Sequence, residues 1–330
     1  MSQTRRARKE QFPVVASERT HVPVASKDFL SVLDLTHEEL HRVLDLAAEL
    51  KRDRSAMARS FQPLAGRHVA LLFDKPSLRT RTTFTIAIRE LGGEVIEPPA
   101  DVAFGGRESV EDVARNLERW LDAAVVRTFA QERLARFAEA AKSLHVVNAL
   151  TDEEHPCQAL ADMMTLRERI GSLEGATLAF VGDGNNVAVS LAHAGAMLGV
   201  NIRVASPSGY ELPAAAVEAF HRVARHGATI EVTTDARKAV AGADAVYTDV
   251  WASMGQESEA DDRARIFAPF QVNDELMQAA GSKAAFMHCL PAHRGLEVTD
   301  SVMDSAASVV FDQAENRLHT QKALLALLMR

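Results

Sequence analysis

Residues 68–74 read HVALLFD, and the run SLRTR at 77–81 follows them after two intervening residues. The first run is short and apolar, which predicts a buried strand, and a helical pattern begins near Arg79. The loop between them directs free backbone amides and the positive end of the helix dipole at one place, where guanidinium and hydroxyl groups add donors. This arrangement predicts a phosphate site, although an exposed basic helix start would carry the same residues.

The alternation of a strand with a helix continues along most of the chain. A first series of strands is expected at 68–74, 123–128 and 146–150, with helices near 79–92, 110–121, 131–142 and 156–169. A second series of strands is expected at 177–182, 202–205, 230–233, 245–248 and 284–289, with helices near 187–199, 212–226 and 274–280. This alternation predicts an α/β fold of two doubly wound parallel-sheet domains joined by interdomain helices.

The two ends of the chain are expected to differ from these series. Thr36 and Glu39 form a capping-box pattern that predicts a helix at about 37–51. A last helix is expected at about 315–329, with one apolar face. The predicted division is a flexible N-terminal extension at 1–27, domains at 28–160 and 161–312, and a C-terminal helix at 313–330.

Composition sets limits on the class of protein. The chain has 330 residues, of which 47% are hydrophobic and 25% charged, and its net charge is −8. That acidic balance disfavours a nucleic-acid surface, and no apolar stretch approaches the roughly 20 residues of a membrane span. Cys157 and Cys289 are the two cysteines, too few for a disulfide framework, which favours the reducing cytoplasm.

Polar residues follow several other expected strands. Ligands of open α/β sheets bind at the carboxyl ends of the strands, so these residues are expected to meet there. They are Arg127 after 123–126, His155 and Gln158 after 146–150, Asp249 after 245–248, and Cys289 after 284–287.

Seven blocks of sequence then occur in one order: KPSLRTRTTF (75–84), VRTF (126–129), HPCQALAD (155–162), VGDGNNV (181–187), TDVWASMGQE (248–257), HCLP (288–291) and AENRLHTQKALL (314–325). On these blocks the chain resembles the aspartate/ornithine carbamoyltransferase superfamily, and its ornithine-specific members in particular. The resemblance spans about residues 27–330. It implies transfer of the carbamoyl group from carbamoyl phosphate to the side-chain amine of L-ornithine by direct amine attack, giving L-citrulline and phosphate.

The resemblance also implies roles for individual residues. Phosphate is expected to be held by Ser77, Arg79, Thr80 and Arg127, with Leu78 giving its backbone amide. The carbamoyl group is expected to be polarised and oriented by Thr80, Arg127, His155 and Gln158, and Arg317 completes the positive site. The amino acid is expected to contact Asn186, Asp249, Ser253, Met254, Cys289 and Leu290.

The loop at 182–186, GDGNN, permits a second interpretation as a dinucleotide-binding turn. Val187 stands where that motif has its third glycine, and no acidic residue for a ribose follows at the right place. The loop is therefore assigned to the amino-acid substrate, and no cofactor is expected. The expected partners are the two small substrates and other copies of the chain, as a homotrimer or a multiple of trimers, with no nucleic acid and no membrane.

Cys289 has three possible roles: a covalent nucleophile, a zinc ligand with His288 and His293, or a residue that shapes the pocket. Adjacent residues on a strand point to opposite sides, which disfavours a zinc site, so no metal is expected. The amine of family members attacks directly, which makes a covalent nucleophile unnecessary. The pocket role is therefore favoured.

Three positions depart from the family pattern: Leu78, Thr85 and Ala103. A bulky apolar residue at Leu78 is more familiar from relatives that use acylated ornithines. Ala103 stands where many relatives carry a glutamine that reaches the neighbouring subunit, and Arg107 is a possible substitute. Two alternatives stay open: a carbamoyltransferase for another amine, such as putrescine or an acylated ornithine, and a non-catalytic paralogue.

Overall fold

The structure of the protein is a computed structural model that describes residues 22–99, 106–252 and 257–330. Three positions singled out from the sequence, Ala103, Ser253 and Met254, lie outside these described residues. Residues 22–27 pack against the rest of the chain: the Val24 amide donates to the Leu327 carbonyl at 3.1 Å. Lys27 Nζ donates to the carbonyls of Ala138, Ala141 and Leu144.

The first domain is built on a four-stranded sheet in the order β2-β1-β3-β4. Its strands are β1 (His68–Phe73), β2 (Glu94–Ile96), β3 (Ala123–Arg127) and β4 (His145–Leu150), and every pairing is parallel. Its helices are α3 (Leu78–Glu90), α5 (Val110–Leu117) and α6 (Gln131–Ala140). Strand β2 was not expected, because its three residues lack a buried apolar run.

The second domain carries a five-stranded parallel sheet in the order β7-β6-β5-β8-β9. The strands are β5 (Thr177–Val181), β6 (Asn201–Ala205), β7 (Ile230–Thr233), β8 (Ala245–Thr248) and β9 (Ala285–His288). The helices around it are α8 (Asn186–Leu198), α9 (Ala214–Val223), α10 (Ala236–Val240), α11 (Ala260–Phe267), α12 (Asp274–Ala280) and α13 (Asp300–Met303), with 3-10 turns η3 (Glu257–Glu259) and η4 (Ala268–Phe270). The predicted fold class is confirmed.

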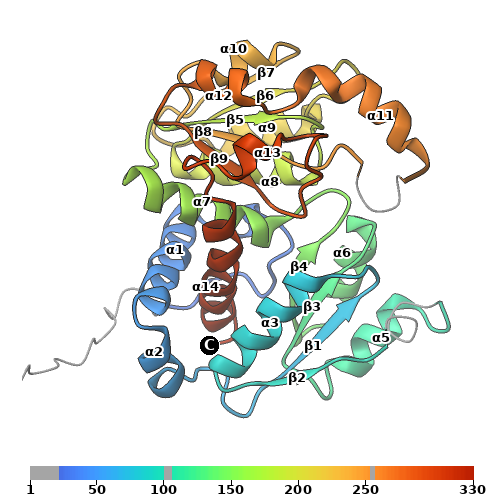
Figure 1. The fold of residues 1–330 in the computed structure, drawn as a ribbon. Coiled ribbons are helices and arrows are strands. Elements are labelled where there is room, and N and C mark those ends of the chain that lie inside the picture. Colours follow the sequence, from blue (N-terminus) through green and yellow to red (C-terminus); the bar gives the residue numbers. More distant parts are fainter. Residues whose placement is uncertain (1–21, 100–105, 253–256) are drawn as a thin grey trace, which may run out of the picture.

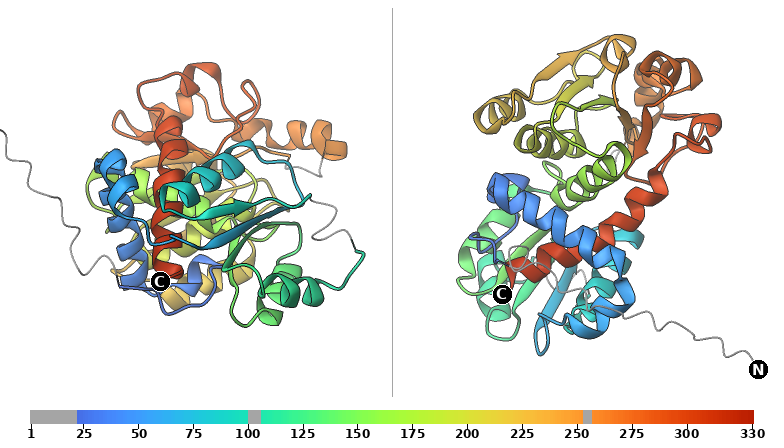
Figure 2. Two further views of the ribbon diagram at one scale, coloured as in Figure 1. Left: turned by 90° about the horizontal axis from the view of Figure 1, so that it is seen from below. Right: turned by 90° about the vertical axis from the view of Figure 1, so that its left-hand side faces the viewer.

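Helices join the two domains (Figure 1). They are α1 (His37–Arg52), which follows η2 (Val32–Asp34) and precedes α2 (Arg54–Ser60), then α7 (Pro156–Ile170) and α14 (Val310–Leu328). The capping box of α1 is present, since the Thr36 hydroxyl accepts from the Glu39 amide and the Glu39 carboxylate accepts from the Thr36 amide. Figure 2 shows α14 running from the second domain down along the first, where the C-terminus lies.

Helix α14 differs from its prediction in length and in burial. It begins at Val310, five residues before the expected start, and from Asn316 to Leu328 its polar side chains are buried as well as its apolar ones. Its contacts with α1, α3 and α7 enclose it on several sides. The expectation of a single apolar face was wrong for this buried part, because the three neighbouring helices leave it no face toward solvent.

Alternation along β1 shows how the sheets are covered. Val69, Leu71 and Phe73 point into the large apolar core, which continues through α1, α7 and α14 into the second domain. Ala70 and Leu72 point into a smaller core on the other face, under α5 and α6. A third core covers the far face of the second sheet. The two sheets are therefore held in place by one shared apolar core.

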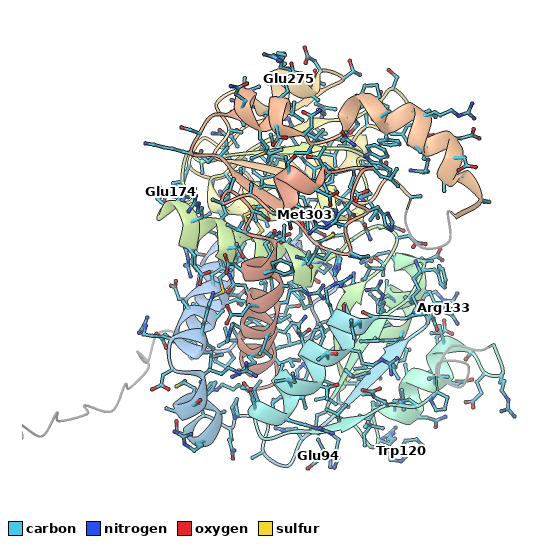
Figure 3. The ribbon with its side chains drawn as sticks, in the orientation of Figure 1. Glu94, Trp120, Arg133, Glu174, Glu275 and Met303 are labelled. Atoms are coloured by element: carbon cyan, nitrogen blue, oxygen red, sulfur yellow. The ribbon has the colours of Figure 1, made fainter. Side chains whose placement is uncertain are left out.

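The carboxyl ends of the first sheet's strands face the second domain. Glu94, which starts β2, and Trp120, which precedes β3, both lie at the end of the first domain that is remote from the second (Figure 3). Parallel strands share their direction, so the residues that follow them are carried toward the junction. Among the helices of the described residues, none is long and apolar enough to cross a membrane.

Candidate active site

Two elements of the first domain begin the site: the start of α3 and the end of β3. Ser77 precedes α3 in an extended conformation as its N-cap residue. Arg127, the last residue of β3, is 8% exposed, and its Nη1 donates to Ser77 Oγ in a long hydrogen bond of 3.4 Å. The structure therefore brings the predicted phosphate ligands of the two elements together at a helix N-terminus, which favours anions.

Arg317 on α14 joins this group from the other end of the chain. Its Nη2 donates to Thr80 Oγ1 at 2.8 Å, and its Nη1 donates to Gln158 Oε1 at 2.9 Å. All three side chains are almost fully buried. Helix α14 thus places one guanidinium between α3 and α7.

The two buried arginines form no direct ion pair with a carboxylate of the described residues. Among these residues the Nε atom of each arginine lacks a hydrogen-bond partner, and Asp162 acts on Arg317 only through its charge. Burial lowers the pKa of Arg127 to about 10, and the positive charge of Arg317 acts in the same direction. Burial lowers the pKa of Arg317 too. Buried cations without a partner are costly, so the pocket is suited to an anionic ligand.

His155 lies beside these arginines, directly before α7. Its backbone amide donates to Ser190 Oγ at 2.9 Å, and its Nδ1 has no partner among the described residues. Burial, followed by the charges of Arg317 and Arg127, holds the pKa of His155 well below its usual range. The imidazole is therefore neutral at physiological pH, and its unpartnered nitrogen is available to a ligand.

Gln158 has both ends of its amide engaged. Its Nε2 donates to Asp162 Oδ1 at 2.8 Å, one turn further along α7, and its Oε1 accepts from Arg317. Asp162 was not among the predicted site residues, although it is the last residue of the block HPCQALAD. The spacing within that block indicates the contact, because a carboxylate four residues after a glutamine lies on the same face of a helix.

The second domain contributes Asp249 after β8 and Cys289 after β9. Asp249 Oδ1 accepts from Cys289 Sγ at 3.0 Å, and its Oδ2 accepts from Asn185 Nδ2 at 2.8 Å. Asn185 was not predicted as a site residue, because its neighbour Asn186 was the residue of this loop that was assigned to the amino-acid substrate. Asn185 also accepts from the amides of Val187 and Ala188, so the cap of α8 orients the carboxylate.

The environment of Cys289 bears on its predicted roles. Burial, and then the negative charge of Asp249, raise the pKa of the Cys289 thiol well above its ordinary value. A thiol that keeps its proton is a poor nucleophile, since the thiolate is the reactive form. This environment favours the pocket role over covalent catalysis.

One group of side chains has the composition of a metal site. The ligand atoms of Asp249, His288 and Cys289 lie within 4.8 Å of one another. His288 is not free to bind a cation, since its Nδ1 accepts from the Leu290 amide at 2.8 Å and its Nε2 faces Glu297 at 3.2 Å. His293, the other suggested zinc ligand, is half exposed and lies 3.9 Å from Glu297.

The remaining predicted residues lie around the same junction. Asn186 Nδ2 donates to the Thr151 carbonyl at 2.5 Å, so it bridges the second domain to the loop after β4. Leu290 has a positive φ of 61°. Arg79 is partly buried and lies close enough to lower the pKa of Arg127, whereas the Leu78 side chain is exposed.

Arg81, in the opening run, lies apart from this pocket. Its Nη1 pairs with Glu97 at 2.5 Å, and both side chains are partly exposed. A cavity of about 530 Å³ also lies apart, beside α11, and is lined by Tyr210, Glu259, Asp262, Arg263, Arg265 and Ile266. Arg263 in that cavity already pairs with Asp183 at 2.7 Å. Neither feature belongs to the buried arginine pocket.

Two parallel-sheet domains with a buried cationic pocket at their junction are typical of proteins that bind small anionic ligands. Comparison with known families narrows the class. Residues 27–168 match the family model "Aspartate/ornithine carbamoyltransferase, carbamoyl-P binding domain", and residues 174–328 match "Aspartate/ornithine carbamoyltransferase, Asp/Orn binding domain". The chain belongs to the aspartate/ornithine carbamoyltransferase family.

Individual relatives agree with this assignment. The chain is 50% identical to the ornithine carbamoyltransferase of Parafrankia sp. (strain EAN1pec), over 93% of this chain and 97% of the relative. Its structure is similar to ornithine carbamoyltransferase from Pyrococcus furiosus, with a TM-score of 0.89 and 46% identity over 93% of this chain and 98% of the other. It is also similar to the anabolic ornithine carbamoyltransferase from Campylobacter jejuni, with a TM-score of 0.85 and 34% identity over 92% and 99%.

Proposed function

We propose that this protein transfers the carbamoyl group of carbamoyl phosphate to the side-chain amine of L-ornithine, giving L-citrulline and phosphate. The observation that carries the proposal is the pair of buried guanidinium groups of Arg127 and Arg317, which have neutral hydrogen-bond partners but no carboxylate at ion-pair distance among the described residues. A ligand that brings a phosphate and a polar carbonyl supplies the negative charge that these groups lack. The relatives' shared name, ornithine carbamoyltransferase, supports the choice of the second substrate.

The first domain is assigned the carbamoyl phosphate. Ser77, Arg79, Thr80 and Arg127, with the backbone amide of Leu78, would hold the phosphate at the start of α3. The neutral His155 would donate to the carbonyl oxygen together with Arg127, where charge develops during attack. Gln158 Oε1 keeps a lone pair beside the one used by Arg317, and that lone pair can accept from the carbamoyl amide.

The second domain is assigned the amine. Asp249 and Cys289 would orient the attacking nitrogen, while Asn186, Ser253, Met254 and Leu290 would contact the rest of the amino acid. The uncharged amine forms the new C–N bond to the carbonyl carbon. The C–O bond to phosphate then breaks, and the nitrogen gives up a proton. Catalysis by this route depends mainly on positioning and on electrostatic stabilisation.

The larger organisation follows from the same assignment. We propose that residues 28–160 bind carbamoyl phosphate, that 161–312 bind ornithine, and that 313–330 return to the first domain. The family models and the packing of α14 on α1 and α3 support this division. Assembly as a homotrimer or a multiple of trimers, a place in the cytoplasm and a role in arginine metabolism complete the proposal; the unpaired Cys157 and Cys289 support a reducing compartment.

A citrulline-forming assay tests the function. Purified protein and carbamoyl phosphate are mixed with L-ornithine, N-acetylornithine or putrescine, and each carbamoylated product is measured. We expect L-ornithine to be the preferred amine. If N-acetylornithine or putrescine is preferred, that amine replaces L-ornithine as the assigned substrate. If no carbamoylated product forms, the result favours a non-catalytic paralogue.

A further inference from the structure

Asp162 is a fully buried carboxylate that the proposed mechanism does not use. It lies on α7, and three side chains from three elements donate to it. They are Gln158 Nε2 at 2.8 Å from α7, Gln313 Nε2 at 2.9 Å from α14, and the Tyr247 hydroxyl at 3.1 Å from β8. A buried carboxylate requires such donors, since burial without them costs several kcal/mol.

The donors continue toward both halves of the pocket. On one side, Gln158 accepts from Arg317, which itself donates to Thr80. On the other side, Gln313 Oε1 accepts from the His288 amide at 2.9 Å, one residue before Cys289. Tyr247 lies two residues before Asp249 on the same chain segment. Through Gln158, Asp162 is thus connected to the residues proposed to bind carbamoyl phosphate. Through Gln313 and Tyr247 it is connected to the segments that carry the residues proposed to bind the amine.

We propose that Asp162 is a positioning residue that sets the orientation of the Gln158 amide, and through it the Arg317 guanidinium, in the carbamoyl phosphate pocket. The inference rests on the proposed function for the substrate that fills the pocket. An acceptor at position 162 requires Gln158 to present its Nε2 there. Oε1 is then the atom that faces Arg317, and a reversed amide would point its NH₂ group at the guanidinium instead.

Acidity supplies a second line of support. Burial raises the pKa of Asp162 to about 6, against the opposing effect of Gln158, Gln313 and Tyr247. The titratable groups that face it are Tyr247 on β8, Arg317 on α14 and Cys289 after β9. Protonation would put a hydrogen on an acceptor that three donors already share. Activity that depends on this acceptor is therefore lost as the pH falls through about 6.

The test is a double-mutant cycle with Asp162→Asn and Gln158→Ala. The apparent Kd of carbamoyl phosphate is measured by calorimetry without amine, and kcat is measured by citrulline formation. Asparagine leaves one acceptor oxygen for three donors and adds an NH₂ group, so Gln158 is no longer held in one orientation. Alone, Asp162→Asn is expected to weaken binding about tenfold and lower kcat by about 100-fold. In the Gln158→Ala background its further effect on either quantity is expected to stay under about threefold, because the side chain through which it acts is gone.

Thr165→Val is the matched control. Thr165 lies almost one turn further along α7, is buried, and accepts from Asn316 of α14 at 2.9 Å, so its loss removes a similar bond between the same two helices. We expect kcat and Kd to stay within about twofold of the parent protein. Equal fold-losses from Asp162→Asn with and without Gln158 would show a merely structural role and overturn the inference.

A second variant keeps the inference testable if Asp162→Asn does not fold. Tyr247→Phe removes one donor and should raise the pKa of Asp162, moving the acidic limb of the kcat/KM profile to higher pH. An unmoved limb would contradict the inference. The proposed function and the role of Asp162 can be tested separately. A parent protein that binds carbamoyl phosphate but forms no citrulline would refute the proposed function. The Kd values of the double-mutant cycle would still test the role of Asp162.

Discussion

Arg317 Nη2 lies 2.8 Å from Thr80 Oγ1, although 237 positions separate the two residues in the chain. Thr80 belongs to the first turn of α3 and Arg317 to α14, so the contact closes the pocket between the start and the end of the protein. The guanidinium is buried here with no carboxylate partner among the described residues. A bound anion would therefore stabilise the folded protein as well as fill the pocket.

Arg127→Ala is expected to lower kcat by about 10²–10³, the usual effect of removing one donor that stabilises developing charge. Arg127 lies at the end of β3, where it is expected to reach both the phosphate and the carbonyl of the substrate. The value of kcat is measured by steady-state citrulline formation. Arg81→Ala is the control: its side chain pairs with Glu97 at the surface, so its activity should remain within about twofold. Similar losses in both variants would contradict the assigned pocket.

Cys289→Ser should lose much less activity than Arg127→Ala, by roughly tenfold or less in kcat. Serine keeps a donor toward Asp249, and the raised pKa of the Cys289 thiol disfavours a reactive thiolate at neutral pH. The measurement is kcat at saturation with both substrates. A folded serine variant that binds both substrates but does not turn over would restore the covalent role.

The rate at low ornithine concentration should rise by about tenfold per pH unit from pH 7 to 9, because the attacking amine resembles that of lysine, with a pKa near ~10.4. The relevant measurement is kcat/KM for ornithine. Cys289→Ser should give the same slope, since the thiol keeps its proton in this range. A slope that disappears in the serine variant would assign the titration to the thiol instead of the substrate.

His319 on α14 is expected to make stability depend on pH. The side chain is buried, and burial lowers its pKa to about 4. The unfolded chain binds a proton near pH 6.5 and the folded one does not, so stability falls as the pH drops from 6.5 toward 4, with a slope on the order of 1 kcal/mol per pH unit. Chemical denaturation at several pH values should show a shallower slope for His319→Gln.

Thr320→Val provides the comparison for that experiment, since it changes a buried side chain of the same helix without removing a titratable group. It should leave the slope of the parent protein unchanged. An identical slope in the His319 variant would show that other groups, such as the buried His155, carry the acid sensitivity.

Local pattern was sufficient to predict most of the regular structure. The capping box at Thr36 and Glu39 located the start of α1, because it depends on residues three positions apart. The apolar runs at β1, β3 and β8 located strands, since parallel strands are buried on both faces. Strand β2 and the full extent of α14 were missed because their pairing and burial come from distant partners.

The sequence by itself determined the order of the main strands and helices, the fold class and the candidate ligands at the strand ends, since each depends on residues that are neighbours in the chain. Only the tertiary structure decided which side chains touch. Asp162 was identified by its hydrogen bond with Gln158, and Asn185 by its hydrogen bond with Asp249. Arg81 was excluded from the pocket because it pairs with Glu97. The physical reason is that hydrogen bonding and desolvation depend on distances between elements, which chain folding sets and local pattern does not contain.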